Sequence, residues 1–397
     1  MFAFRYQPLK SFYVVYTFLS ILFVRLPYWC IISAIPASRP RPSWSMSRSI
    51  LLHGCKAIAT MLFATGAFPS VDIEAQSKTI DSFVWVDGVP EDLVRGEIAD
   101  MAKQNNVKSI RVHGYWYGKK GAGGGYAQPA SKDERVLYHF HGGGFLAGTA
   151  SPTGQYAPIM NGILEHAGGV VDRAFGLDFR LASAAPRKVE NPFPAQLLDA
   201  IAGYRYLVHS VGFSPDNIII GGDSAGAHLA ISLCLYLNRY ALPGLSPPRA
   251  LILLSPTADW ACTHNVDASS SLMANSSSDY AGVYFLSGYT ATALRGSLPL
   301  EEVRTNIWLS PSSLNIANVA NQFSNFPPTC IIASGDEQSL DGIRTIHRRL
   351  AGDNPDKSVV YWEYPNSLHD FVALKIHEPE RSEALNRLHD WLKTVLY

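Results

Sequence analysis

The chain contains 397 residues, of which 47% are hydrophobic and 17% are charged. This low charged fraction argues against a disordered chain and against a nucleic-acid-binding protein. The 33 basic and 33 acidic residues cancel, so the net charge gives no sign of a polyanionic partner. The five cysteines are scattered without a CxxC spacing, which predicts neither a disulfide framework nor a zinc site.

The chain opens with a hydrophobic segment. Residues 11–36 contain one charged residue, Arg25, and exceed the roughly 20 residues that a helix needs to cross a bilayer. We predict that residues 1–36 form a single-pass membrane anchor, although Arg25 costs such a span about 2.5–3.5 kcal/mol. A cleaved signal peptide and an amphipathic or buried helix are the alternatives.

The orientation of this anchor stays open. Arg39, Arg41 and Arg48 follow the segment, and the positive-inside rule then places the rest of the chain in the cytosol. The sequon that begins at Asn275 would instead suit a domain in the lumen of the endoplasmic reticulum, with Asn275 as a glycosylation candidate.

The remaining chain is organised in two parts. Residues 37–134 are predicted to hold a Pro-, Ser- and Arg-rich linker, cap elements within 51–105, and the first strands. Residues 135–397 form the predicted α/β core, in which short apolar strands alternate with helices. Strands without polar alternation indicate a mostly parallel sheet that helices cover on both faces. We expect the strands at 136–140, 217–220, 250–254, 329–333 and 359–364, and helices at 197–209 and 225–238.

The pentapeptide Gly222-Asp223-Ser224-Ala225-Gly226 lies between a predicted strand and a long helix. A nucleophilic serine on such a sharp turn needs glycine on both sides, because other side chains would clash. The helix that follows points its N–H groups at the site. The pattern predicts that Ser224 is a nucleophile, although a Gly-Ser turn alone also arises by chance.

A second motif, His141-Gly142-Gly143-Gly144, follows the strand at 136–140 directly. Acyl transfer builds negative charge on a carbonyl oxygen, and preorganised backbone N–H groups stabilise that charge. We expect the amides of Gly143, Gly144 and Ala225 to form this oxyanion hole. His141 is expected to anchor the loop rather than to act as the base.

Together these motifs resemble the hormone-sensitive-lipase-like branch of the α/β hydrolases, which carries HGGG and GDSAG. Residues 177–181, residues 192–195 with Asp199, and Ser310-Pro311 are also similar to that branch. The resemblance covers residues 135–395. It implies an α/β-hydrolase fold with a helical cap and a serine esterase that needs no metal or organic cofactor. The anchor and the stretch RPSWS are also similar to membrane-bound fungal esterases of the steryl acetyl hydrolase type.

The base and the acid are expected after the serine in chain order. His369 lies in the loop after the last predicted strand, where a neutral imidazole can accept the serine proton. The family places an acid after the strand at 329–333, and alignment with its usual motif puts Glu337 there. Asp336 and Asp341 remain alternatives, since any buried carboxylate can orient the imidazole.

We therefore expect a carboxylic ester hydrolase that acts on a small lipophilic ester, for which short acyl groups such as acetate are favoured. An amidase or an acyltransferase with the same residues is an alternative. A non-catalytic ligand receptor on the same fold is another. The sequence predicts no nucleic-acid partner and leaves the oligomeric state open.

Overall fold

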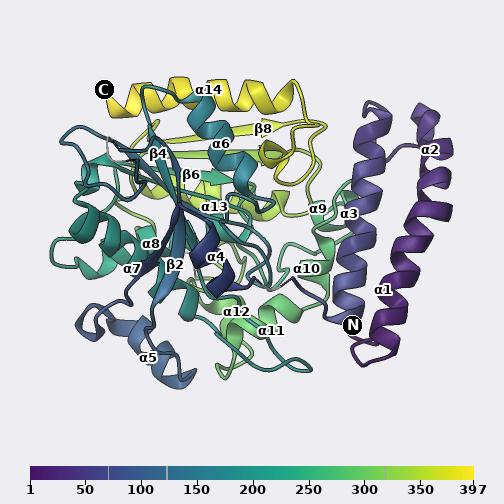
Figure 1. Cartoon of the computed structure of the whole chain (residues 1–397), viewed down its shortest axis with the longest axis horizontal. Coiled ribbons are helices and arrows are strands. Elements are labelled where there is room, and N and C mark those ends of the chain that lie inside the picture. Colours follow the sequence, from purple (N-terminus) through teal and green to yellow (C-terminus); the bar gives the residue numbers. More distant parts are fainter. Residues whose placement is uncertain (70, 122–123, 318) are drawn as a thin grey trace.

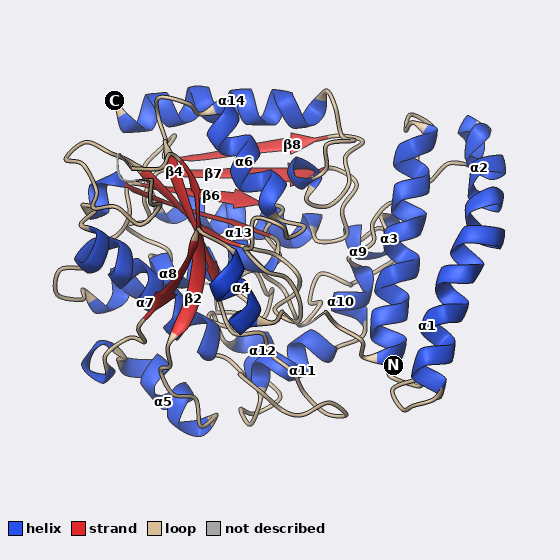
Figure 2. Cartoon of the chain, viewed as in Figure 1, coloured by secondary structure: helices blue, strands red, loops and turns tan. Residues whose placement is uncertain are grey.

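A central sheet of eight strands dominates the computed structural model, which describes residues 1–69, 71–121, 124–317 and 319–397 (Figure 2). The strands are β1 (Phe83–Val86), β2 (Val112–Gly118), β3 (Val136–Phe140), β4 (Arg173–Asp178), β5 (Ile218–Asp223), β6 (Ala250–Leu254), β7 (Thr329–Ser334) and β8 (Val359–Tyr364). Their spatial order is β1-β2-β4-β3-β5-β6-β7-β8. Strand β2 runs antiparallel to β1 and β4, and the other neighbours are parallel. The mostly parallel sheet agrees with the predicted fold class.

Helices cover both faces of this sheet (Figure 1). Those of the core are α5 (Gly96–Gln104), α6 (Ala157–His166), α7 (Ala195–Arg205), α8 (Ala225–Tyr240), α13 (Leu340–Asp353) and α14 (Glu380–Leu396). The shorter ones are α4 (Ile73–Thr79), α9 (Ser271–Ala274), α10 (Gly282–Leu286), α11 (Tyr289–Arg295) and α12 (Glu302–Thr305). A π-helical turn, Tyr206–Val211, extends α7. One-turn 3-10 helices lie at Pro36–Ser38, Glu91–Leu93, Pro215–Asn217 and Phe371–Ala373.

Each central strand is buried on both faces. Along β5, Ile218 and Ile220 point into one hydrophobic core with α7, α8 and α13, whereas Ile219 points into a second core with α6 and α14. Successive side chains of a strand alternate between the two faces. A strand covered by helices on both sides therefore reads as a continuous apolar run, which is the pattern in the sequence.

The N-terminal segment forms one long helix at the side of the molecule (Figure 1). It consists of α1 (Leu9–Ser20), a π-helical turn (Ile21–Arg25) and α2 (Leu26–Ala34). By length and composition, Leu9–Ala34 can cross a membrane, although a signal sequence passes the same test. It lies alongside α3 (Met46–Thr65), whose N-terminus is capped by the Ser45 hydroxyl. The long helix and α3 therefore form a two-helix layer on one side of the protein.

Candidate active site

Ser224 stands on the turn between β5 and α8, as its motif predicted. Its φ of 51° and ψ of −116° lie outside the regions that serine prefers. Such strain persists only where the surroundings impose it, and it is common at active sites. Here the Ser224 N–H donates to the Leu254 carbonyl at the end of β6, over 2.9 Å. The turn therefore holds the hydroxyl above the carboxyl ends of the parallel strands.

The two glycines that flank this turn allow backbones to approach closely. A Cβ atom on Gly226 would overlap the carbonyl oxygen of Phe140 at the end of β3, and one on Gly222 would overlap the Gly226 carbonyl. A larger residue at position 222 would therefore force β5 and α8 apart, and one at position 226 would force α8 away from β3. The spacing of the motif is thus set by how tightly the strand, the turn and the helix pack.

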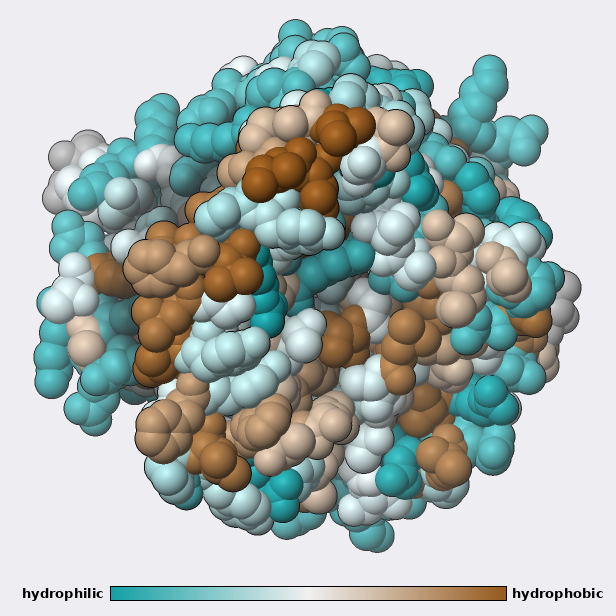
Figure 3. Space-filling model, turned by 90° about the vertical axis from the view of Figure 1, so that its right-hand side faces the viewer, coloured by the Kyte–Doolittle hydropathy of each residue, from teal (hydrophilic) through white to brown (hydrophobic). Residues whose placement is uncertain are grey.

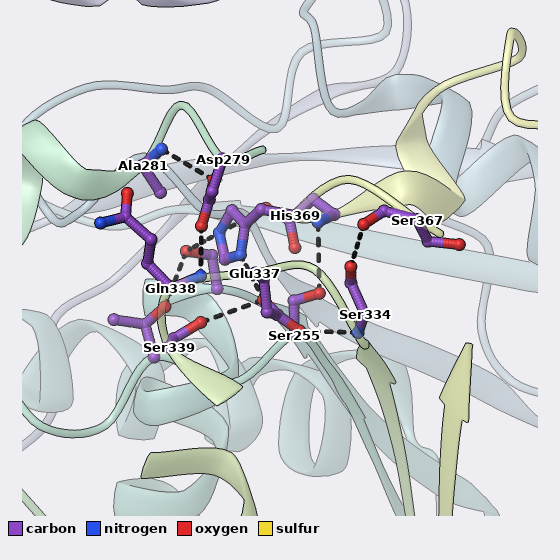
Figure 4. Close-up of polar contacts among 12 residues, drawn as sticks. Ser255, Asp279, Ala281, Ser334, Glu337, Gln338, Ser339, Ser367 and His369 are labelled. Atoms are coloured by element: carbon purple, nitrogen blue, oxygen red, sulfur yellow. Dashed lines mark hydrogen bonds and ion pairs between the residues drawn. The ribbon is translucent and has the colours of Figure 1, made fainter. Parts of the chain in front are cut away.

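His369 and Glu337 come from neighbouring loops and contact each other (Figure 4). The His369 Nε2 lies 2.9 Å from the Ser224 Oγ, and its Nδ1 lies 2.5 Å from a Glu337 carboxylate oxygen. The Glu337 carboxylate also accepts from the Ser334 N–H (2.7 Å) and the Ser339 hydroxyl (3.0 Å). The geometry is that of a nucleophile, a base and an orienting acid in one hydrogen-bonded line.

The two alternative acids face elsewhere. The Asp336 carboxylate is held by the Arg41 guanidinium at 2.7 Å. The Asp341 carboxylate accepts from the Ser271 N–H at 2.7 Å and so joins α13 to α9. Among the three predicted carboxylates, Glu337 alone contacts His369.

The loop His141–Gly144 lies beside Ser224. Gly143 and Gly144 have positive φ angles of 99° and 64°, which turn the backbone toward the site. Within the described residues, neither amide donates a hydrogen bond to the protein. The Ala225 amide opens α8 directly after Ser224, where the first N–H groups of a helix have no partner within it. The three amides thus have no hydrogen-bond acceptor among the described residues, and they belong to the loop and the turn that adjoin Ser224.

Asp223 connects this loop to the serine turn. One of its carboxylate oxygens accepts from the Gly142 N–H at 2.8 Å, and the other pairs with the His139 imidazole at 2.9 Å. His141 is fully buried and stacks on Phe179 at a centroid distance of 4.4 Å. Burial lowers the pKa of His141, so the ring stays neutral. His141 therefore packs inside the protein and anchors the loop, as predicted.

The charge state of His369 reflects its surroundings. Burial acts to lower the pKa of the imidazole, but the Asp370 carboxylate and the hydrogen bond that the imidazole donates to Glu337 outweigh burial and raise it to about 10. An Asp370 oxygen lies 3.4 Å from the same Nε2 that contacts Ser224. Burial also raises the pKa of Asp370 itself well above its usual value. The pair therefore holds a proton to higher pH than a free imidazole does.

A cavity of about 500 Å³ opens in front of Ser224 and His369. Its remaining lining is mostly apolar and comes from α3, the HGGG loop, the region of α10 and the loops after β6 and β8. The lining residues are Leu51, Gly54, Cys55, Ile58, Ala59, Leu62, Gly143, Gly144, Gln155, Tyr156, Trp260, Tyr280, Ala281, Tyr284, Phe285, Asp370, Ala373 and Leu374. Among the described residues of the stretch 51–105, predicted as cap, those that line the cavity all belong to α3. Helix α5 instead lies against the end of α8, where the Arg95 N–H donates to the Tyr236 hydroxyl.

The glycosylation prediction for Asn275 is wrong for the folded chain. Asn275 is buried, and its Nδ2 donates to the Glu337 carbonyl at 2.9 Å. Its Oδ1 accepts from Arg41 at 2.7 Å. A glycan on Nδ2 would have to replace these bonds and push the acid-bearing loop aside. A sequon is a pattern of three residues and does not indicate whether its asparagine is buried in the folded protein.

The linker between α2 and α3 is bound to both loops that carry the predicted acid and base. Arg41 contacts Asp336, next to Glu337. The Ser43 hydroxyl donates to the Asn366 side chain (2.6 Å), and Arg48 binds both the Asn366 carbonyl (3.1 Å) and Glu380 (2.8 Å). The composition of this segment predicts a linker without specific contacts. Its arginines indicate the orientation of a membrane anchor, and nothing in the local sequence indicates that they bind the acid and base loops.

Comparison with known proteins identifies the fold family of the chain. A family model described as "alpha/beta hydrolase fold" matches residues 137–373. An acetyl-hydrolase of Streptomyces hygroscopicus is 34% identical over 137 residues, which cover 34% of this chain and 40% of that protein. The esterase LipU of Mycobacterium tuberculosis is 24% identical over 265 residues, covering 67% of this chain and 80% of that one.

The fold is also found among solved structures. An esterase of the bacterial hormone-sensitive lipase family superposes with a TM-score of 0.56 at 22% identity, covering 94% of this chain and 99% of that chain. The chain therefore belongs to the α/β-hydrolase fold family, and it is similar to esterases and, over 40% of its length at 26% identity, to the human hormone-sensitive lipase.

Proposed function

We propose that the protein is a serine carboxylesterase with Ser224 as nucleophile, His369 as base and Glu337 as orienting acid. The observation that carries this proposal is the unbroken line of contacts from the Ser224 Oγ to His369 (2.9 Å) and on to Glu337 (2.5 Å). The relatives named esterase and acetyl-hydrolase support ester hydrolysis.

The reaction proceeds in two acyl-transfer steps. His369 takes the Ser224 proton while the oxygen attacks the ester carbonyl, and the amides of Gly143, Gly144 and Ala225 stabilise the oxyanion. The alcohol leaves with the proton from His369, and the acyl group stays on Ser224. Water, deprotonated by His369, then hydrolyses the acyl-enzyme and restores the serine. This chain's own residues supply every proton transfer.

The substrate is proposed to be a lipophilic ester with a short acyl group. The cavity beside Ser224 is lined mainly by apolar and aromatic side chains, such as Ile58, Leu62 and Tyr284. A volume of about 500 Å³ accommodates a small lipid or another compact hydrophobic ester. The acetyl-hydrolase relative supports acetate as the acyl group.

A fluorophosphonate probe tests the nucleophile, because it reacts covalently with activated serines. We expect the full-length protein to be labelled and the Ser224→Ala variant to remain unlabelled. Ser255→Ala is a matched control, since Ser255 is buried nearby and its hydroxyl accepts from the Asp370 N–H. Absence of labelling in the folded wild type would favour a non-catalytic receptor.

A series of p-nitrophenyl esters measures the preference for acyl-chain length. Assays with amide substrates and with alcohol acceptors then distinguish amidase and acyltransferase activity from ester hydrolysis.

We also propose that the helix at Leu9–Ala34, predicted from sequence as a single-pass anchor, attaches the protein to a membrane. Its apolar, largely exposed surface supports this. Intact-mass measurement of the protein purified from its host tests the alternative of a cleaved signal sequence. We expect the N-terminal peptide to be retained, and its loss would contradict the proposal.

A further inference from the structure

The N-terminal end of the long helix is packed into the core of the protein. Phe2 is fully buried, with its ring 4.8 Å from that of Tyr289 on α11. Its N–H donates to the Phe63 carbonyl at 2.7 Å, and the Phe4 N–H donates to the Ala64 carbonyl at 2.9 Å. The residues before α1 are thus fastened to the C-terminal end of α3.

The C-terminal end of the same helix is fastened to the other end of α3. Trp44, just before α3, is fully buried and packs with Leu52 and Leu368. Arg39 donates to the Trp44 carbonyl at 2.6 Å, and Arg41 binds Asp336 at 2.7 Å. Both ends of the helix therefore join the catalytic domain, at opposite ends of α3.

This arrangement conflicts with a helix that crosses a bilayer. Leu9–Ala34 has 26 residues, which corresponds to about 39 Å of helix. A spanning helix places its two ends on opposite sides of a hydrocarbon layer about 30 Å thick. Spanning would pull Phe2 out of the core. If Phe2 instead stayed in the core, a spanning helix would bring α3 and the cavity behind it into the lipid, together with charged groups such as Arg48 and Lys56.

The two faces of the helix differ in character. The inner face carries Thr17 and Ser33, which are buried, and Trp29, whose ring stacks on His53 of α3 at 5.5 Å. Arg25, the charged residue in the middle of the span, donates to the Ser20 hydroxyl at 3.0 Å, and the half-buried Lys10 lies in the first turn of α1. Thr17, Ser33 and the Trp29 ring therefore face the protein, whereas Ser11 at the N-terminal end of the helix is exposed.

The outer face is apolar and unpartnered. Its large exposed side chains, each more than half exposed, are Leu9, Phe12, Val15, Tyr16, Phe18, Leu19, Leu22, Phe23, Val24, Tyr28 and Ile31. Figure 3, which views the molecule from the side of this helix, shows hydrophobic patches along this face. Apolar residues gathered over seven helical turns, with no charge among them, match the acyl region of a lipid leaflet.

We infer that the helix at residues 9–34 lies along the membrane surface, with its outer face in one leaflet and both of its ends on the side of the catalytic domain. The partner of this surface is a lipid leaflet. The inference concerns attachment and does not depend on the proposed esterase activity. It places α3 as a layer between the lipid and the catalytic cavity.

Labelling of introduced cysteines tests which side each end occupies. Ala3→Cys, Ala37→Cys and Tyr397→Cys are made singly in the full chain, at exposed positions before the helix, after it and at the far terminus. Each variant is inserted into sealed microsomes and treated with a membrane-impermeant maleimide. Site-resolved mass spectrometry separates the new cysteine from the native ones.

We expect all three positions to react alike, either before detergent permeabilises the vesicles or only after it. Reaction at position 3 on the opposite side from positions 37 and 397 would establish a spanning helix and overturn the inference. Recovery of the wild-type chain in the supernatant after high-salt washing would overturn the membrane partner as well.

Charge placed on the outer face gives a second measurement. In flotation with phosphatidylcholine vesicles, the double variant Leu19→Lys with Phe23→Lys is expected to reduce the bound fraction at least tenfold. Leu300→Lys is the matched control, because Leu300 is 71% exposed and Phe23 is 68% exposed, but Leu300 lies on another surface. Equal binding by the double variant and the wild type would contradict the role of this face.

Discussion

At the level of single residues, the Glu337 side chain is fixed from several directions. The Ser334 N–H and the Ser339 hydroxyl donate to its carboxylate, and the imidazole of His369 takes the remaining position. The Ser334 hydroxyl in turn donates to the Ser367 carbonyl, which ties the acid-bearing strand to the loop of the base (Figure 4). This network fixes the orientation of the imidazole and, when the ring is neutral, keeps the proton on Nδ1 so that Nε2 can accept one.

Replacing Glu337 by Gln is expected to lower kcat by about 10⁴-fold, because an amide no longer stabilises the imidazolium or its tautomer. The comparison is kcat for p-nitrophenyl acetate, with circular dichroism to verify folding. Asp336→Asn, one residue away, should retain kcat within about tenfold of the wild type, since Asp336 does not contact His369. The reverse ranking would make Asp336 the acid.

A second prediction concerns pH. Ser224 attacks only when His369 is neutral, so activity falls as the pH drops through the pKa of His369. The Asp370 carboxylate helps to raise that pKa to about 10. Asp370→Asn removes this effect, so the acidic limb of the kcat/KM profile is expected to move to lower pH. Asp341→Asn, outside the cavity, should leave the limb in place; an unmoved limb in Asp370→Asn would refute the assignment.

Among the secondary-structure elements, α3 determines the size of the cavity. Its residues Leu51, Gly54, Ile58 and Leu62 recur every three or four positions and so lie on the face that lines the cavity. A Cβ atom on Gly54 would meet nothing within 4 Å. Side chains added at this position therefore extend into free space.

Gly54→Phe is expected to fill part of the cavity and to raise KM for esters of bulky alcohols at least tenfold, while p-nitrophenyl acetate is affected less than threefold. Gly54→Ala is the matched control: it should leave both KM values within twofold and stabilise the helix by about 0.5–1 kcal/mol. Equal losses for large and small esters in Gly54→Phe would show that this wall does not select substrates.

The sequence predicted those strands and helices whose formation depends on residues close to one another in the chain. The strands β3, β5 and β6 and helix α8 lie close to the residues where apolar runs and the motif at 222–226 indicated them. The first two strands, β1 at the sheet edge and β2 beside it, were expected only as unplaced first strands. The antiparallel direction of β2 depends on its pairing with β4, which lies more than fifty residues later and leaves no local pattern.

At the scale of the whole molecule, packing between segments far apart in the chain produces the contacts that could not be predicted from the sequence. The spacing of motifs brought Ser224, His369 and Glu337 forward as candidates, because an ordered fold fixes where strands end. The contact of Arg41 with Asp336 and the burial of Asn275 join segments more than 200 residues apart. The burial of Phe2 likewise depends on side chains from α3 and α11. Such contacts follow from the assembled fold and not from any repeat or motif.

The docking of the N-terminus leads to a prediction for global stability. Phe2→Ala empties a fully buried position, and such a change costs about 3–5 kcal/mol of the free energy of unfolding. Urea denaturation of the full-length chain in detergent micelles measures the loss. Phe12→Ala is the control, because Phe12 is 68% exposed and should change this free energy by less than about 0.5 kcal/mol. Equal stabilities for the two variants would mean that Phe2 is not docked.

The contacts of Arg41 and Ser43 have a practical consequence for anyone who produces a shortened form. A cut at residue 36 keeps both contacts, whereas a cut at residue 45 removes the guanidinium that covers Asp336 and the hydroxyl bound to Asn366. Two soluble fragments that differ by nine amino acids would then differ in how firmly the acid and base loops are braced. Turnover compared between such fragments reports on this bracing as well as on the missing helix.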